Sequence, residues 1–324
     1  MSILLAAIAK DESPYLAEWV YYHLKLGFNA IKIYINNTTD SSVSILANIN
    51  KKYPNVTYEV VDFILEENYK INENLVTKKF HSTNRIQSRS YADILEKNKN
   101  FDNIMFLDID EYLFLKDKYS LRKLCDKHSN FAVKWFNETG DALSFAPALK
   151  RKIKGTKARN FKSCISTRSK NIRIINSHAI NIQDKRAYLL GYGQMQTGFD
   201  KHQDTSWDDN AFIIHRHLRS QKEYLALLLR GDTIKNSSDG YKSNRRGWYN
   251  KYSHEIEIEF DKVYQHVKGL NKFIFECEIQ SIILESRQML LDKAESVIKR
   301  EEKRSKEMKI LKRIFNGTEI SDFY

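Results

Sequence analysis

Two aspartates, Asp108 and Asp110, follow directly after an apolar run at residues 104–107. Such a run is typical of a buried strand, and alternation along a strand would place both carboxylates on one side. Carboxylate oxygens at an open strand end suit Mn²⁺ or Mg²⁺, which keep coordination positions for phosphate oxygens. The pair therefore predicts a divalent-cation site that stabilises the charge of a departing nucleotide diphosphate. A solvated acidic turn is the alternative.

The first 115 residues alternate strand and helix signals, which is a pattern that positions such a site. Strands are expected at residues 3–8, 30–35, 56–63 and 104–107, and helices at residues 14–26, 42–49 and 86–95. Repeated strand–helix–strand units give a mostly parallel sheet, in which ligands bind outside the carboxyl ends of the strands. Polar clusters at residues 10–12, 36–37 and 108–111 fall at three of these ends.

Short motifs follow one another along residues 3–231. They are Lys10-Asp11-Glu12 with Glu18-Trp19, Tyr22-His23-Leu24 with Leu26-Gly27, Asn37 with Asp40-Ser41, Gln87 with Tyr91, the run from Phe106 to Leu113, Lys134-Trp135-Phe136 with Gly140, and His215 and His217 with Ser220 and Tyr224. In order and spacing they resemble the motifs of bacterial glycosyltransferases of the family 2-like and family 92-like group. The resemblance rests on the order and spacing of all these motifs together, and no single motif is sufficient for it.

The resemblance implies a GT-A fold, which is Rossmann-like, with a mostly parallel sheet flanked by helices. It also implies metal-dependent transfer of a sugar from a nucleotide-diphosphate donor, for which a UDP-sugar is favoured, with Mn²⁺ or Mg²⁺ on Asp108 and Asp110. The side chains expected at the donor are those of Lys10, Glu12, Asn37, Asp40, Gln87 and Asp108. This chain departs from the family pattern at Asn36, where an acidic residue is frequent, and at Asp11, which replaces Asn.

His215 is expected as a third metal ligand, because GT-A enzymes often recruit a histidine from late in the sequence. The apolar pair at residues 213–214 predicts a strand that delivers it. A structural histidine is the alternative, and His178 is a weaker candidate. Trp135 is expected either to stack on a sugar ring or to lie in the core.

An inverting transfer needs a base that takes the proton of the acceptor hydroxyl. The candidates are Glu138, Asp141, Asp208 and Asp209. Glu138 is favoured, because the resemblance places the segment from Trp135 to Gly140 near the acceptor. Each of these side chains has an equally simple interpretation as an ordinary surface carboxylate.

Composition narrows the class of protein. The 324 residues are 42% apolar and 29% charged, which excludes a wholly disordered chain. The 53 Lys and Arg against 41 Asp and Glu give a net charge of +12, which attracts nucleic acid, anionic lipid or phosphorylated substrates. No Cys-x-x-Cys pair and no long apolar segment occurs, so we expect a cytoplasmic protein, with peripheral contact at the inner face of the plasma membrane left open.

We expect a GT-A domain at residues 1–225 and a helical region at 226–324 with a basic amphipathic helix. That helix would lie on an anionic membrane, pair as a coiled coil in an oligomer, or pack on the domain. The basic stretch at residues 150–173 has no acidic residue and would hold a diphosphate, an anionic acceptor or nothing. The expected acceptor is a glycan or lipid-linked glycan of a surface polysaccharide, lipopolysaccharide or capsule.

Three alternatives remain open at this point. A nucleic-acid-binding protein would explain the charge, but no small basic–aromatic module is recognisable, so no nucleic acid is expected as a partner. A phosphatase of the haloacid-dehalogenase type also places Asp-x-Asp after a strand, but usually carries Thr or Val where this chain has Tyr112. A catalytically silent scaffold of GT-A fold is the third.

Overall fold

The computed structural model describes residues 1–76, 86–116, 119–174, 180–182, 187–195, 206–230, 240–242, 244–304 and 309–323. The chain forms two compact units, each built from several stretches. The first unit comprises Met1–Phe136, Lys157–His215 and Gly269–Glu278, and the second comprises Asn137–Thr156, Arg216–Lys268 and Ile279–Tyr324. The single boundary near residue 225 remains a prediction.

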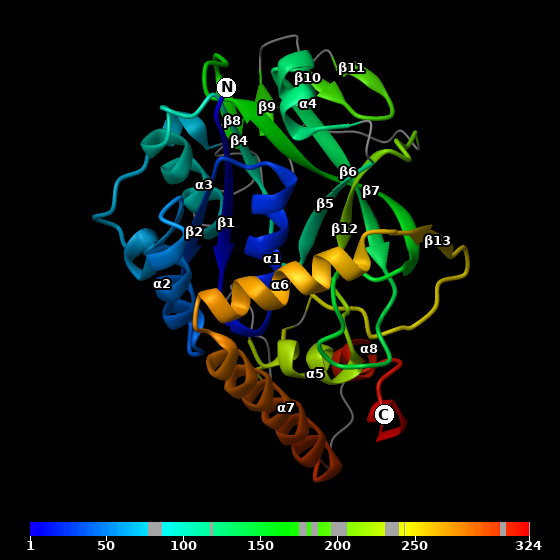
Figure 1. Cartoon of the computed structure of the whole chain (residues 1–324). Coiled ribbons are helices and arrows are strands. Elements are labelled where there is room, and N and C mark those ends of the chain that lie inside the picture. The colour runs from blue at the N-terminus through cyan, green and yellow to red at the C-terminus, as the bar shows by residue number, and fades with distance from the viewer. Residues whose placement is uncertain are drawn as a thin grey trace. The chain divides into compact units, whose positions relative to one another are not determined.

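A parallel sheet forms the centre of the first unit (Figure 1), with the strand order β4-β1-β2-β3. Its elements are β1 (Ile3–Ala9), α1 (Ser13–Leu26), β2 (Ala30–Ile35), α2 (Ser42–Lys52), β3 (Val56–Val60), α3 (Ile86–Lys97) and β4 (Asn103–Phe106). The expected alternation of strands and helices is confirmed, and so is the α/β fold class with a mostly parallel sheet. Gly27 ends α1 in a left-handed conformation, with φ of 111°, which glycine adopts without steric cost.

Further strands extend this sheet beyond the parallel core. They are β5 (Glu111–Leu115), β6 (Asn130–Glu138), β7 (Lys152–Ser166), β10 (Ala187–Leu189), β11 (Gly193–Met195) and β12 (Ala211–His215), with α4 (Leu121–Lys127) between β5 and β6 and a separate pair of β8 (Ile172–Ile174) and β9 (Ile180–Ile182). β7 runs antiparallel to β4, and β12 runs antiparallel to β5. β3 ends at Val60, three residues short of the prediction, because the chain turns there into a short 3₁₀ helix at Asp62–Leu65.

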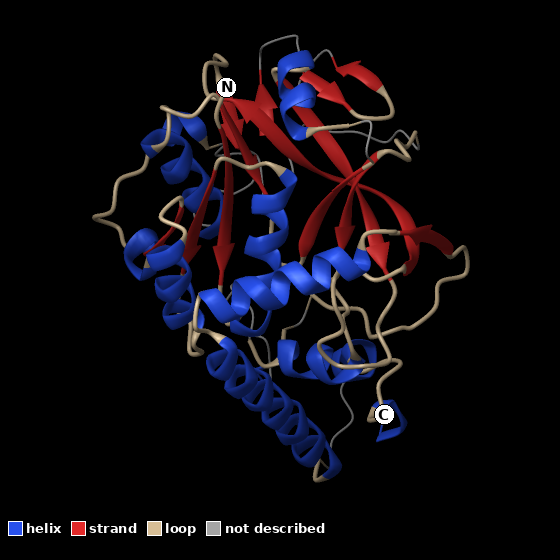
Figure 2. Ribbon diagram, in the orientation of Figure 1, coloured by secondary structure: helices blue, strands red, loops and turns tan. Residues whose placement is uncertain are grey.

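The second unit is largely helical, as Figure 2 shows for α5, α7 and α8. Its elements are α5 (Gln221–Leu228), β13 (Ile256–Glu259), α7 (Gln280–Glu302) and α8 (Lys309–Ile314), while α6 (Val263–Glu276) runs from the second unit into the first. The predicted helical character is confirmed, except that β13 pairs with the first residues of β7.

The apolar stripe of the predicted amphipathic helix is used inside the second unit. Ala294 and Val297 of α7 are fully buried in one cluster with Leu225 and Leu228 of α5, and Leu290 packs against it. Membrane contact and coiled-coil pairing through this helix remain predictions. Met308, which continues the helical spacing of apolar residues in the sequence, lies outside the described residues. None of the helices that the structure describes is long and apolar enough to cross a membrane.

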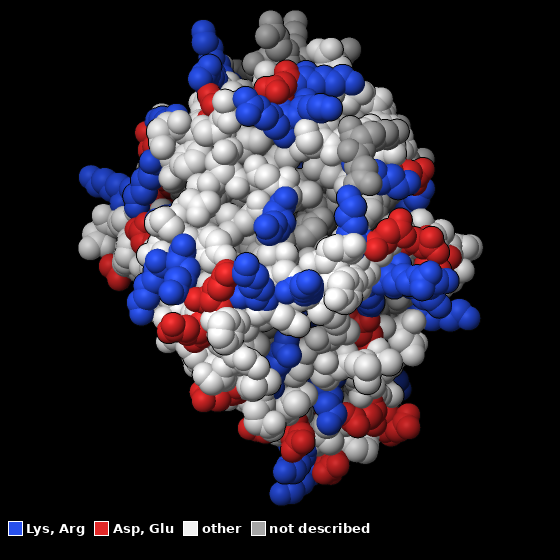
Figure 3. Space-filling model, viewed as in Figure 1, with Lys and Arg blue, Asp and Glu red and all other residues white. Residues whose placement is uncertain are grey.

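Charged side chains of both signs are mixed on the face of the molecule that Figure 3 shows. Lys and Arg are spread over this face, with Asp and Glu between them. The net charge of +12 is therefore not gathered there into one continuous basic surface.

Candidate active site

The predicted acidic motif forms a turn between β4 and β5 rather than the continuation of a strand. The Asp108 carbonyl accepts a hydrogen bond from the Glu111 amide at 3.0 Å, and the Asp108 amide donates to Glu111 Oε2 at 2.9 Å. Because a turn separates β4 from β5 here, strand alternation does not apply to Asp108 and Asp110. The expectation that both carboxylates share one side of a strand is therefore wrong, and their side chains have different partners.

Helix α1 holds this turn in place. The Trp19 indole N–H lies 3.0 Å from the carbonyl oxygen of Asp108 and 2.9 Å from that of Glu111. The Tyr22 hydroxyl donates to the carbonyl of Leu113 in β5 at 2.7 Å. Trp19 and Tyr22 of these motifs thus have a physical role, which is to fix the backbone of the acidic turn and of β5.

His23 completes this anchor as a fully buried neutral imidazole. Its Nδ1 lies 2.8 Å from the Trp19 carbonyl and its Nε2 accepts the Leu113 amide at 3.3 Å. Nδ1 therefore carries the proton. Burial lowers the pKa of His23 to about 3, against the smaller raising effect of its hydrogen bond to the Trp19 backbone.

The buried His23 makes the stability of the first unit depend on pH. The unfolded chain binds a proton at this residue below about pH 6.5 and the folded chain only near pH 3, so the free energy of unfolding falls as the pH drops through this window. We expect a contribution of up to about 1.4 kcal/mol per pH unit. Urea unfolding at pH 4, 5, 6 and 7 should give a flatter profile for His23→Gln, and equal slopes for both proteins would contradict this.

The Asp108 carboxylate is held by three donors from two elements. Its Oδ1 accepts hydrogen bonds from Gln87 Nε2 at 3.0 Å and from the Tyr91 hydroxyl at 3.3 Å, both on α3. Its Oδ2 lies 2.9 Å from the Lys162 ammonium on β7. Gln87 and Asp108, which the resemblance places at the donor, are therefore in direct contact.

Lys162 is a buried cation that the sequence analysis missed. Its ammonium lies 3.3 Å from Glu111 Oε2 as well as 2.9 Å from Asp108, and its side chain is 1% exposed. Burial lowers the pKa of Lys162, but the carboxylates of Asp108 and Glu111 outweigh it and raise this pKa well above its usual value. Burial raises the pKa of Glu111 well above its usual value, although the Lys162 ammonium acts to lower it. The only signal for Lys162 in the sequence was that it belongs to the basic stretch at residues 150–173.

Asp110, Glu111 and His215 form a cluster that suits a divalent cation. One ligand atom from each lies within 4.8 Å of the others, and Asp110 Oδ2 is 3.7 Å from His215 Nε2. The predicted strand that ends at His215 is confirmed as β12, and its antiparallel register with β5 sets His215 opposite Glu111. Glu111 Oε1 is buried without a hydrogen-bond partner, as expected for an atom that awaits a ligand.

The donor set of this cluster, two carboxylates and one imidazole, fits Mn²⁺ or Mg²⁺. Of the three predicted metal ligands, the structure brings Asp110 and His215 together and adds Glu111, while Asp108 contacts Lys162 instead. The Trp135 ring lies beside His215, with 3.9 Å between the ring centroids. Trp135 therefore borders the cluster, and His178 lies outside the described residues.

Asp40, predicted near the nucleotide, binds the first turns of two helices. Its carboxylate accepts hydrogen bonds from the amides of Ser13 at 2.8 Å and Ser42 at 2.9 Å, and from the Thr38 hydroxyl at 2.9 Å. Burial raises the pKa of Asp40, but these hydrogen bonds outweigh it, so the net pKa is lowered. The carboxylate thus stabilises the N-termini of α1 and α2.

The other predicted donor residues lie at the carboxyl ends of β1 and β2. Lys10 is half-buried directly after β1, and the Glu12 amide donates to Ser42 Oγ at 3.3 Å. Asn37 has a left-handed backbone with φ of 47°, and its amide donates to Asp62 Oδ1 at 2.6 Å. The strand ends meet at one edge of the sheet, as the topology predicts.

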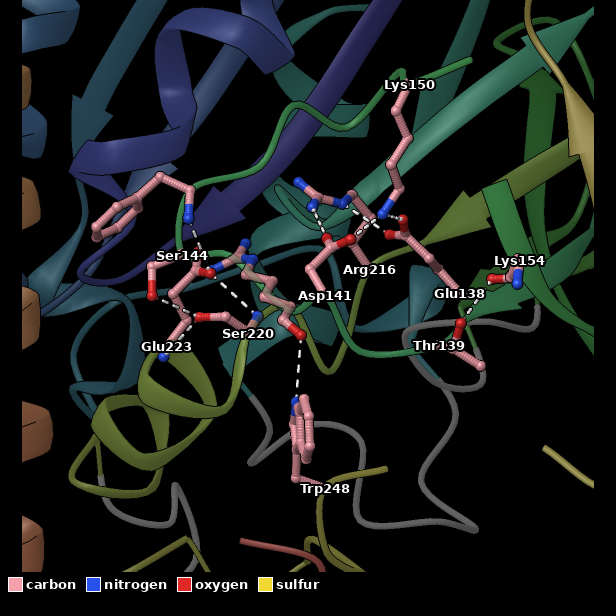
Figure 4. Close-up of polar contacts among 12 residues, drawn as sticks. Glu138, Thr139, Asp141, Ser144, Lys150, Lys154, Arg216, Ser220, Glu223 and Trp248 are labelled. Carbon is pink, nitrogen blue, oxygen red and sulfur yellow. Dashed lines mark hydrogen bonds and ion pairs between the residues drawn. The ribbon is translucent and has the colours of Figure 1, made fainter. Parts of the chain in front are cut away.

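Two of the predicted bases, Glu138 and Asp141, form a buried ion-pair network in the second unit (Figure 4). Arg216 lies between them, with Nε 2.7 Å from Glu138 Oε2 and an Nη atom 2.6 Å from Asp141 Oδ2. Lys150 contacts both carboxylates, at 2.7 Å from Glu138. Each carboxylate therefore contacts both Arg216 and Lys150, one cation on each of its oxygens.

Asp209 has a different setting in the first unit. Its side chain is 71% exposed and its Oδ1 lies 3.0 Å from Lys157 Nζ. The neighbouring Asp208 accepts hydrogen bonds from Asn210 at 2.9 Å and from Tyr119 at 3.3 Å. The base remains unassigned among these predicted carboxylates.

The late motif with Ser220 is explained by helix capping. Ser220 Oγ accepts the Glu223 amide at 3.3 Å, while Glu223 Oε2 accepts the Ser220 amide at 3.0 Å (Figure 4). This reciprocal pair is a capping box, which the spacing of Ser and Glu three residues apart would have predicted. The Trp248 indole N–H donates to the Arg219 carbonyl at 3.2 Å and braces the segment that precedes α5.

Comparison with known proteins identifies the family of this chain. Residues 6–185 match the sequence model of glycosyltransferase family 92, which is more than half of the chain. The crystal structure of HddC from Yersinia pseudotuberculosis is similar at 11% identity over 52% of this chain and 77% of that chain, with a TM-score of 0.28. No curated protein sequence matches.

Proposed function

Because the chain belongs to glycosyltransferase family 92 and is a glycosyltransferase, we propose that it transfers a sugar from a nucleotide-diphosphate donor in a metal-dependent reaction. The observation that carries the proposal is the cluster of Asp110, Glu111 and His215 at the carboxyl side of β4. These three residues would hold Mn²⁺ or Mg²⁺. The ion would offset the negative charge that develops on the departing nucleotide diphosphate.

The residues around the cluster supply binding and orientation. Trp19 fixes the backbone of the acidic turn through two carbonyl groups, and Gln87 orients the Asp108 carboxylate. We assign the donor nucleotide to the strand ends that carry Lys10 and Asn37. UDP is the favoured nucleotide. Trp135, whose ring contacts that of His215, would border the transferred sugar.

We propose an inverting transfer to a glycan or lipid-linked glycan in the synthesis of a surface polysaccharide, lipopolysaccharide or capsule. This part of the proposal rests on the resemblance of the motifs. The acceptor hydroxyl must lose a proton to a base. The carboxylate oxygens of Glu138 and Asp141 all contact Lys150 or Arg216, which favours a base elsewhere.

Phosphotransfer through Asp108 is the weaker alternative. A nucleophilic carboxylate needs an oxygen that can reach a phosphorus atom, whereas both Asp108 oxygens accept contacts from Gln87, Tyr91 or Lys162. Nucleic-acid binding has only the net charge in its favour, and Figure 3 shows that charge mixed with acidic side chains on one face.

Thermal unfolding with nucleotides tests the proposed donor site. We expect UDP with Mn²⁺ to raise the melting temperature, GDP and CMP to raise it less, and each nucleotide without a metal to have little effect, because only ligands that bind the folded state stabilise it. At a ligand concentration of roughly 100 times Kd the stabilisation is about 2.7 kcal/mol. A folded protein that no nucleotide stabilises, with or without Mn²⁺, would contradict the proposal.

A further inference from the structure

We propose that Lys162 is a positioning residue that keeps Asp108 off the metal, so that the acidic motif binds one divalent cation through Asp110, Glu111 and His215. The inference rests on the proposed function, because it concerns the same site. It differs from the sequence-based expectation, in which Asp108 and Asp110 hold the ion together.

The position of Lys162 is set by the sheet. Cys164, two residues along β7, pairs with Met105 of β4 in the antiparallel register. This places the Lys162 side chain beside the turn that follows β4, where its ammonium lies 2.9 Å from Asp108 Oδ2 and 3.3 Å from Glu111 Oε2. Because Lys162 belongs to a strand of the sheet, its backbone position is fixed more firmly than that of a lysine on a loop.

The ammonium occupies the space between Asp108 and Glu111 that a cation would otherwise take. A divalent ion that bridged these two carboxylates would lie against Lys162 with the same sign of charge and little water between them. On its other oxygen, Asp108 accepts hydrogen bonds from Gln87 and Tyr91. Asp108 is therefore satisfied by protein groups.

The carboxylates of the acidic turn divide into two groups. Asp108 contacts Lys162, whereas Asp110 clusters with His215. Glu111 joins the two halves, because its Oε2 faces Lys162 while its Oε1 is buried without a hydrogen-bond partner and is left for the ion.

Mn²⁺ titration of the full chain, followed by the electron paramagnetic resonance signal of the free ion, tests this assignment. We expect the wild-type protein to bind one Mn²⁺, and Asp108→Asn to bind one with less than a tenfold loss of affinity. We expect Lys162→Gln, which frees Asp108 and Glu111, to bind a second Mn²⁺, and Lys162→Arg to bind one.

A loss of Mn²⁺ affinity of tenfold or more in Asp108→Asn would overturn the inference, because it would make Asp108 a ligand. One Mn²⁺ in Lys162→Gln with unchanged affinity would also overturn it. In both cases the metal site of the proposed function would stand. If the wild-type protein binds no Mn²⁺, the metal site itself fails. Since Asp108→Asn is nearly isosteric, it keeps the test decisive even where Lys162→Gln does not fold.

Discussion

Replacing Asp110 by Asn is expected to lower both the Mn²⁺ affinity and the rate of UDP release from a UDP-sugar by about 100-fold or more. The reason is that the carboxylate lies 3.7 Å from His215 and would supply a charged ligand to the proposed ion, and loss of metal stabilisation costs several kcal/mol in the transition state. Hydrolysis of the donor can be followed without a known acceptor. Mn²⁺ titration of the same samples reports the binding step.

The matched control for this variant is Glu96→Gln. Glu96 is an exposed carboxylate on α3 that pairs with Lys99, so its loss should change stability by less than about 1 kcal/mol and leave the Mn²⁺ affinity unchanged. Equal Mn²⁺ affinity in Asp110→Asn and the wild-type protein would show that the cluster is not the metal site.

Replacing Arg216 by Met is expected to be the most destabilising change in the second unit. Arg216 is 4% exposed and pairs with Glu138 and Asp141, so its removal leaves two buried carboxylates with Lys150 as their shared cation. Breaking a buried ion pair from one side typically costs about 3–5 kcal/mol. Urea unfolding at pH 7 should show this loss as an earlier transition.

Lys152→Met is the control for this prediction. Lys152 lies 2.7 Å from Glu257 on β13, but its side chain is 57% exposed, so its loss should cost less than about 1 kcal/mol. A similar, small effect of both variants would contradict the structural role of the network. A large loss of activity in Glu138→Gln with unchanged stability would instead favour Glu138 as the base.

The sequence predicted the parallel core because its signals are local. The strand at residues 3–8, the helix ended by Gly27 and the strand that delivers His215 are all found, since apolar runs and turn residues specify them directly. Asp110 and His215 were paired by the resemblance and are brought together by the register of β12 and β5. Strand alternation failed at Asp108 because the chain turns immediately after β4.

The parts that were missed depend on contacts between residues far apart in the chain. Lys162 meets Asp108 across 54 positions, and nothing local distinguishes it from the other basic residues of its stretch. Arg216 meets Glu138 across 78 positions, so the predicted bases could not be recognised as halves of ion pairs. The burial that distinguishes Lys162 and Arg216 from surface cations arises only from tertiary packing.

Diffraction from crystals soaked with Mn²⁺ and UDP tests the central claim most directly, because the anomalous signal of Mn²⁺ locates the ion without reference to activity. We predict one anomalous peak, bonded to Asp110, Glu111 and His215 and to oxygens of the diphosphate, with Lys162 still between Asp108 and Glu111. A peak bonded to Asp108, or UDP bound at the strand ends with no peak at the cluster, would contradict the account.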